Sequence, residues 1–134
     1  MIFSHKQNDE KTMFNRVAII SIPVGDQQAA KSFYTDKLGC DVVQEMPFSE
    51  DGKVKWIRLE LPGTGTRVVL ATWFPQMKPG SVQGLVLMTG DIAKAHSELK
   101  KRGVAISAIA DQTYGREATF VDQDGKGWVL QQPN

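Results

Sequence analysis

The sequence predicts an α+β protein that contains the same βαβββ unit twice. In each half an apolar, β-branched segment is followed by an aspartate that suits a helix start, Asp26 and Asp91, and then by a helix that ends at glycine, Gly39 and Gly103. The first offset is 65 residues (26 to 91) and the second is 64 (39 to 103). A single match of this kind is common, but two in matching order, each followed by three strand-like segments, favour an internal repeat.

The first unit begins with residues 17–24, whose β-branched side chains are typical of a buried strand. Asp26 fits a helix N-cap, because its carboxylate accepts the unpaired N–H groups of the first turn. A helix is predicted at residues 27–38, and its apolar side chains share one face: Ala30, Phe33, Tyr34 and Leu38. Three strands are predicted next, with turns at residues 51–52 and 62–65 between them: 41–46, 54–61 and 67–74.

The second unit repeats this order from residue 84. A strand at residues 84–89 precedes the Asp91 cap, and the following helix has an apolar face and ends at Gly103. That face is formed by Ile92, Ala95 and Leu99. The remaining strands are predicted at 104–109, 117–121 and 128–131, with a tight turn at 124–125.

We therefore expect one structural domain with four segments. Residues 1–13 are a polar, flexible arm, and residues 14–75 are the first module. Residues 76–82 form a linker punctuated by proline and glycine, and residues 83–134 are the second module. A length of 134 residues fits a single compact domain.

Composition excludes several classes of partner. The net charge is +1, so we expect neither a nucleic acid nor an anionic membrane surface as a partner. The apolar runs are too short to span a bilayer, and the N-terminal residues lack the apolar core of a secretion signal. The single Cys40 suits a reducing compartment. These features predict a cytoplasmic protein.

Three stretches of the chain resemble the vicinal-oxygen-chelate superfamily, which includes glyoxalases, bleomycin resistance proteins and extradiol dioxygenases. Residues 17–39 (VAIISIPVGDQQAAKSFYTDKLG) look like the opening strand and helix of that family, and residues 84–104 (GLVLMTGDIAKAHSELKKRGV) look like the second opening. Residues 114–133 (YGREATFVDQDGKGWVLQQP) resemble its closing segment. The resemblance implies a strongly curved mixed sheet around a cleft that binds a small-molecule ligand. It also implies a homodimer.

Enzymes of this family hold a divalent metal through His, Gln or Glu side chains on the inner strands. Carried over residue by residue, the resemblance puts those four ligand positions on Ile19, Val69, Gly84 and Val129, and none of these has a donor atom in its side chain. The two histidines do not replace them, because His5 lies in the arm and His96 lies within the second helix. We therefore expect no metal and no other cofactor.

Strand alternation indicates what lines the cleft. In residues 54–61 the core side is expected to carry Ile57, Leu59 and Leu61, which leaves Trp56, Arg58 and Glu60 on the opposite side. Trp56 and Arg58 suit stacking against and pairing with an anionic or aromatic ligand, whereas the alternative is a surface pairing of Arg58 with Glu60. Alternation also turns Ser21 toward the cleft. The candidate ligand-binding residues are Ser21, Trp56, Arg58, Glu60, Trp73, Tyr114, Arg116 and Trp128.

The remaining candidates each have a structural alternative. Trp73 and Trp128 suit a stacking wall for a ligand, or equally the core or a dimer interface. Tyr114 and Arg116 lie where a loop enters a strand, which is typical of ligand contacts and also of a simple turn next to a glycine. Cys40 has no histidine nearby to activate it, so we interpret it as a buried structural thiol.

Three functions stay open at this point. The first is a metal-free protein that binds a small organic molecule without converting it. The second is an enzyme of the same superfamily, of the lyase or dioxygenase type, with a displaced or absent metal, for which Arg58, Glu60, Tyr114 and Glu117 are the polar candidates. The third is a structural or regulatory dimer with a vestigial cleft. We favour the first and assign no catalytic residue.

Overall fold

The computed structural model describes residues 13–134 and has the predicted α+β class, with two modules of the same element order. The expected arm, residues 1–13, falls almost wholly outside the described residues. The first module contains β1 (Ile20–Pro23), α1 (Gln27–Ser32), the π-helical turn η1 (Phe33–Lys37), β2 (Asp41–Pro47), β3 (Lys55–Glu60) and β4 (Arg67–Ala71). The second contains β5 (Leu85–Met88), α2 (Ile92–Lys101), β6 (Ala110–Gln112), β7 (Gly115–Val121) and β8 (Gly127–Pro133).

Each module forms its own four-stranded sheet with the same topology. The first sheet has the order β1-β4-β3-β2 and the second β5-β8-β7-β6. In both, the first strand pairs in parallel with the last, and the other pairs are antiparallel. Ser21 of β1 lies beside Val69 of β4, as Val86 of β5 lies beside Val129 of β8, so these rows are structurally equivalent.

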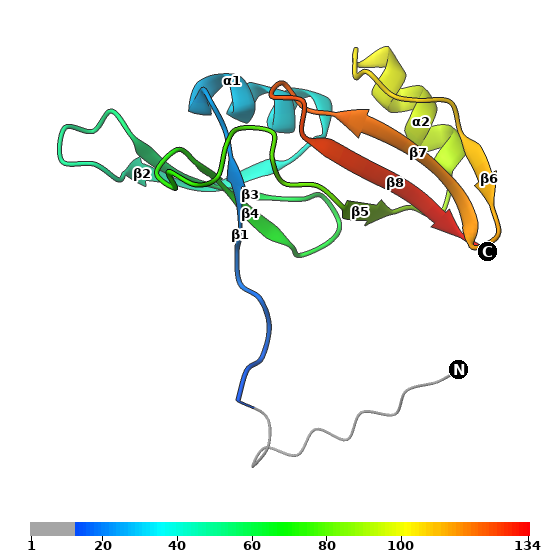
Figure 1. The fold of residues 1–134 in the computed structure, drawn as a ribbon, viewed down its shortest axis with the longest axis horizontal. Coiled ribbons are helices and arrows are strands. Elements are labelled where there is room, and N and C mark those ends of the chain that lie inside the picture. Colours follow the sequence, from blue (N-terminus) through cyan, green and yellow to red (C-terminus); the bar gives the residue numbers. More distant parts are fainter. Residues whose placement is uncertain (1–12) are drawn as a thin grey trace.

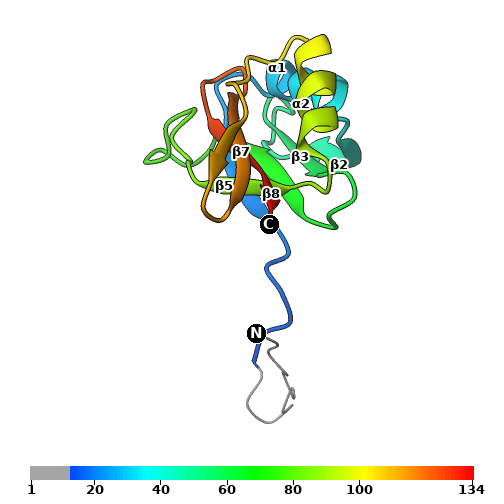
Figure 2. The same ribbon diagram turned by 90° about the vertical axis from the view of Figure 1, so that its right-hand side faces the viewer.

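Both helices lie on the same side of the two sheets, and the segment before β1 runs away from the body of the domain (Figures 1 and 2). The aspartate caps form as predicted. The Asp26 carboxylate accepts the N–H groups of Gln28 and Ala29 at 2.9 and 3.0 Å, and the Asp91 carboxylate accepts that of Lys94 at 3.1 Å. Within residues 13–134, no helix is long and apolar enough to cross a membrane.

The first helix differs from the prediction of one regular helix over residues 27–38. Regular α-helix ends at Ser32, and the next five residues form a π-helical turn. The hydroxyl of Thr35 donates to the carbonyl of Lys31 at 2.8 Å, a back-bond that commonly bends a helix. The widened turn carries Tyr34, which is fully buried against the second module.

Two predicted strands also differ in their limits. Residues 104–109 were predicted as a strand, but only Ile106 makes an isolated bridge, to Phe120, and β6 begins later at Ala110. The strand predicted over residues 17–24 begins at Ile20, which pairs with Val68, and β4 extends only one residue further back, to Arg67. In both cases the pairing partner limits the strand, which side-chain propensity alone does not reveal.

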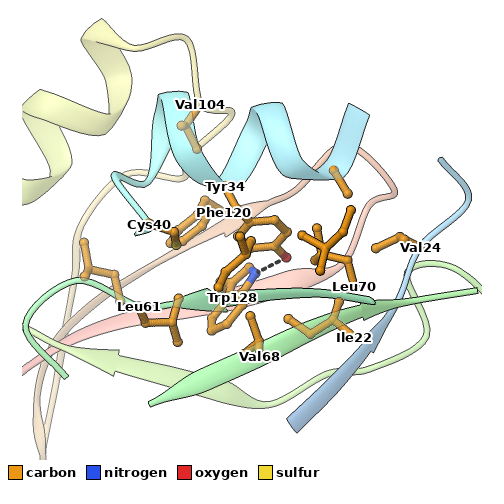
Figure 3. Packing of buried hydrophobic residues seen from close by; sticks show 14 of the residues in the cluster. Ile22, Val24, Tyr34, Cys40, Leu61, Val68, Leu70, Val104, Phe120 and Trp128 are labelled. Atoms are coloured by element: carbon orange, nitrogen blue, oxygen red, sulfur yellow. Dashed lines mark hydrogen bonds between the residues drawn. The ribbon is translucent and has the colours of Figure 1, made fainter. Parts of the chain in front are cut away.

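The two modules share one hydrophobic core beneath the helices (Figure 3). The first module contributes buried side chains that include Ile22, Tyr34, Leu59, Val68 and Leu70. The second contributes Ile92, Val104, Phe120, Trp128 and Leu130. Buried side chains of both modules thus belong to a single continuous cluster.

A buried hydrogen-bonded triad joins the modules across this core. The Tyr34 hydroxyl donates to Asp122 at 2.6 Å and accepts the indole N–H of Trp128 at 3.1 Å, the bond that is dashed in Figure 3. The rings of Tyr34 and Trp128 meet edge to face with their centroids 6.2 Å apart. Burial, together with the hydrogen bond to Asp122 and its charge, raises the pKa of Tyr34 well above its usual value. The hydroxyl therefore stays protonated and able to donate.

Replacing Tyr34 tests this triad. Tyr34→Phe keeps the ring but leaves the Trp128 N–H and an Asp122 oxygen without their buried partner, so we expect a loss of about 1–3 kcal/mol in the free energy of unfolding. Urea denaturation at neutral pH measures it. The matched control is Tyr114→Phe, which removes an exposed hydroxyl that bonds Glu117 and should cost less than about 0.5 kcal/mol. Equal losses in the two variants would contradict the structural role of the triad.

Candidate functional site

The first sheet has an open face, the face that is turned away from its helix and the shared core. On β3 the side chains alternate as predicted, with Ile57 and Leu59 fully buried in the core. Trp56, Arg58 and Glu60 therefore lie on the open face, and all three are half-buried. This face carries most of the residues that the sequence singled out.

Three aromatic rings stack at one end of the open face, and we call Phe48, Trp56 and Trp73 the aromatic cluster. The ring centroids of Phe48 and Trp73 are 4.1 Å apart, and each of these rings lies about 6 Å from that of Trp56, at 6.0 and 5.9 Å respectively. All three pairs are within 21° of parallel. Such parallel rings present a flat, polarisable surface to a planar molecule.

Strand pairing positions these three rings. Trp56 lies opposite Met46 on β2, and its indole N–H donates to Gln44 at 3.0 Å, which fixes the ring. Phe48 follows β2 at the start of the hairpin loop, where its backbone N–H bonds the carbonyl of Val54 at 2.8 Å. Trp73 lies two residues past the end of β4. Sequence analysis missed Phe48, although an aromatic residue beside an Asp-Gly hairpin turn is a usable signal for an exposed ring.

Arg58 occupies the middle of a cross-strand row next to the aromatic cluster. Ser21, Val69, Arg58 and Gln44 lie side by side on neighbouring strands β1, β4, β3 and β2. The guanidinium carbon of Arg58 is 5.9 Å from the ring centroid of Trp56, within the range of a cation–π contact. Its Nε is buried and has no hydrogen-bond partner among residues 13–134.

The surface pairing of Arg58 with Glu60, the alternative that the sequence left open, does not form. Glu60 pairs instead with Arg67 on β4, with Nε and Oε1 3.3 Å apart. None of the ion pairs between described residues includes Arg58. The charge of Arg58 is thus left without a carboxylate on this face.

Two of the predicted residues belong to the second module, away from the aromatic cluster: Tyr114 lies in the turn between β6 and β7, and Arg116 lies on β7. The Tyr114 hydroxyl bonds the carboxylate of Glu117, and that bond raises the pKa of Tyr114 above its usual value. Arg116 pairs with Asp111 through Nε and Oδ1 at 3.1 Å. Both pairs are exposed, and pairs of this kind contribute little to stability.

Trp128 lies in the shared core, with an exposed fraction of 1%. Its indole bonds Tyr34, and the buried ammonium of Lys126 lies 4.0 Å from the centroid of its ring. Desolvation lowers the pKa of Lys126 below its usual value. Of the alternatives that the sequence left open for Trp128, the structure thus gives it a place in the core.

A second hollow runs along the seam between the two modules. It consists of two adjoining cavities of about 280 and 450 Å³, which is the size range of small-ligand pockets. Both cavities are lined by Leu61, Thr64, Leu87 and Met88. This seam groove is largely apolar, and its lining includes Phe120 and Trp128, whose rings lie 11° from parallel with centroids 6.3 Å apart. These two rings are almost wholly buried, however, and no lysine or arginine among the described residues lines the groove.

At the four positions implied for metal ligands, the structure places apolar side chains or none. Val69 is fully buried beside Arg58 on the neighbouring strand, outside the shared core, and Val129 is its counterpart on β8. In the part of the chain that the structure describes, no three His, Cys, Asp or Glu side chains gather where they could hold a metal ion. His96 contacts the carbonyl of Ser107 at 2.8 Å, and His5 lies outside the described residues.

Two modules of the same βαβββ topology that share one core are the architecture of a glyoxalase-type protein. The chain belongs to the Glyoxalase/Bleomycin resistance protein/Dioxygenase superfamily, whose sequence profile matches residues 14–131. This confirms the resemblance seen in the three sequence stretches.

The chain is similar to several solved structures and curated proteins of this type. TnmS3 from Streptomyces sp. CB03234, described as an antibiotic binding protein, has a TM-score of 0.84 and 36% identity over 92% of this chain and 99% of that chain. A superfamily member from Sphaerobacter thermophilus DSM 20745 has a TM-score of 0.78 and 30% identity over 90% and 99% of the two chains. The uncharacterized protein YetH of Bacillus subtilis is 29% identical, over 90% of this chain and 100% of its own length.

The reactivity of Cys40 tests whether its thiol is buried in the core, as the structure places it. Burial, with the charge of Asp41 as a smaller cause, raises the pKa of the Cys40 thiol to about 12, whereas a free cysteine has a pKa of about 8.5. We expect an aromatic disulfide reagent at pH 8 to label the native protein far more slowly than the urea-unfolded protein. Rapid stoichiometric labelling of the native protein would show that Cys40 is accessible and reactive.

Proposed function

We propose that this protein binds a small organic molecule with a planar ring system on the aromatic cluster, without a metal and without converting it. The observation that carries the proposal is the set of three near-parallel rings on an otherwise open sheet face. Aromatic side chains rarely stack at a surface without burying other apolar area, because exposed rings cost free energy. A planar ligand recovers that free energy by covering them.

The similarity to TnmS3 supports binding over catalysis. That protein is described as antibiotic binding, and the two chains match over almost their full lengths at 36% identity. The four positions implied for metal ligands carry no donor side chains here, in keeping with a role that needs affinity and no reactive centre. We therefore propose sequestration of a toxic aromatic compound as the biological use of the site.

We also propose that the protein acts as a homodimer in which a second copy covers the site. Ligand pockets usually bury most of the surface of their ligand, whereas the aromatic cluster of a single chain offers one wall. Apolar side chains on the open face of the second sheet supply the second wall from the partner, since Val86 and Met88 are 47% and 59% exposed. An apolar strand face of this kind is rarely left in water.

Replacing a stacking ring tests the ligand site. Titration of tryptophan fluorescence with naphthalene and anthraquinone derivatives should give saturable quenching, and Trp73→Ala should weaken binding by about tenfold or more through lost stacking and apolar contact. The matched control is Phe74→Ala, a neighbouring exposed ring tilted by 43° out of the parallel stack, which should change affinity little. Chromatography after overnight incubation should recover the ligand unchanged.

The proposal fails if no planar aromatic compound binds saturably. It also fails if Phe74→Ala and Trp73→Ala weaken binding equally, because the parallel stack would then have no special part. A chemically altered ligand would favour the enzyme alternative instead.

Light scattering during size-exclusion chromatography tests the dimer. We expect a particle of about twice the chain mass of 14.8 kDa. Met88→Glu places a charge in the proposed interface and should shift the protein toward the monomer and weaken ligand binding at the same time. A wild-type protein that stays monomeric at high micromolar concentration, or a monomeric variant with full affinity, would contradict the proposed second wall.

A further inference from the structure

Arg58 differs from the other charged groups around it. On the same open face Arg67 has Glu60 as its partner, and at the neighbouring strand edge Lys31 and Lys55 share Glu45 at 2.7 and 3.7 Å. Arg58 takes part in none of the ion pairs between described residues, although its side chain is half-buried. Its positive charge therefore has no carboxylate partner, and it lies between Val69 and Gln44 on this face.

The Nε atom of Arg58 is buried and has no hydrogen-bond partner among the described residues. A guanidinium carries five N–H donors and no acceptor, and a buried donor without a partner costs free energy that a native protein rarely leaves unrecovered. The nearest polar neighbour in the cross-strand row is Gln44, whose amide oxygen already accepts the Trp56 indole N–H. Val69, on the other side of Arg58, has no polar atom in its side chain. The neighbouring side chains of the row therefore leave the guanidinium without an acceptor, and the Nη groups, unlike the buried Nε, are the donors that a ligand can reach.

The distance between Arg58 and the aromatic cluster limits which kind of ligand can stack on the rings and also offer an acceptor to the guanidinium. Trp56 and Arg58 are two residues apart on one face of β3, about 7 Å along the strand. The guanidinium carbon lies 5.9 Å from the Trp56 ring centroid. A molecule that stacks on the cluster thus has its edge beside the guanidinium. An acidic group fixed directly to the ring system reaches Arg58, whereas an acid on a long flexible chain gains nothing from this arrangement.

We propose that the ligand is a planar aromatic acid, with a carboxylate, sulfonate or acidic ring oxygen attached to the ring system and bound by the Arg58 guanidinium. This proposal rests on the proposed function, since it names the class of molecule that the same site takes. A planar guanidinium matches an anionic oxygen pair with two parallel hydrogen bonds, which a lysine does not do. The same charge repels cationic aromatic molecules, so the site selects by charge as well as by shape.

Matched probes separate charge from stacking. The pairs are 2-naphthoate with 2-naphthamide, and anthraquinone-2-carboxylate with its carboxamide, each titrated into the full-length protein by fluorescence quenching or calorimetry. We expect each acid to bind at least tenfold more tightly than its amide, and this preference to shrink as salt is raised. Arg58→Gln should bring acid and amide to equal affinity, and Arg58→Lys should keep only part of the preference. Trp73→Ala should weaken both members of a pair and leave their ratio unchanged.

The outcomes are distinguishable. Equal binding of acid and amide by the wild-type protein overturns the aromatic acid and leaves the stacking function standing. An unchanged preference in Arg58→Gln also overturns it, because the anion would then lie elsewhere. If no probe of either kind binds saturably, the proposed function fails together with this inference. Should Arg58→Gln not fold by circular dichroism, the wild-type ratio and its salt dependence decide the matter alone.

Discussion

The arrangement of the two modules depends on side-chain contacts between them, and the Tyr34 hydroxyl makes the most deeply buried of these hydrogen bonds. Among residues 13–134, no strand of one sheet pairs with a strand of the other, so backbone hydrogen bonds do not set how the sheets are oriented. Side-chain packing in the shared core and the Asp122–Tyr34–Trp128 triad do so instead, together with exposed hydrogen bonds between Lys37 and Arg102 and between Gly25 and Asp124. Asp122 also accepts the backbone N–H groups of Asp124 and Lys126, so one carboxylate links the turn before β8 to the helix of the first module. The contacts between the modules thus set how the open face of one sheet is oriented relative to that of the other.

The sequence was enough to predict the α+β class, the repeated unit and the alternation on β3, because each depends on local patterns of side-chain type. It was not enough for features that depend on distant partners. Residues 104–109 have strand-like side chains but find only one bridge, and Trp128 lies in the core because Tyr34 of the other module receives its N–H. Phe48 was missed for a related reason, since its place beside Trp73 depends on how the β2–β3 hairpin lies against the end of β4.

The two sheets show how far the halves of a repeat have diverged. Val69 and Val129 occupy equivalent rows, so Arg58 on β3 corresponds to Thr119 on β7, and Trp56 corresponds to Glu117. The first sheet thus carries a ring and a cation where the second carries small or acidic polar groups. The backbone that positions these side chains is the same in both halves, which shows that the topology sets where a site lies and the side chains set what it recognises.

Phe48 and Trp73 already stack on each other, with centroids 4.1 Å apart, so the Phe48 ring occupies a face of Trp73 on which a ligand ring would stack. A guest ring that inserts there must first displace a ring that the chain already provides, and an aromatic pair of this kind is worth about 0.5–1.5 kcal/mol. Only a molecule that stacks on Trp73 more favourably than the phenyl ring of Phe48 therefore gains free energy by replacing it. If the proposed ligand inserts beside Trp73, the contact with Phe48 sets the stacking free energy that it has to exceed, which favours fused ring systems over single rings.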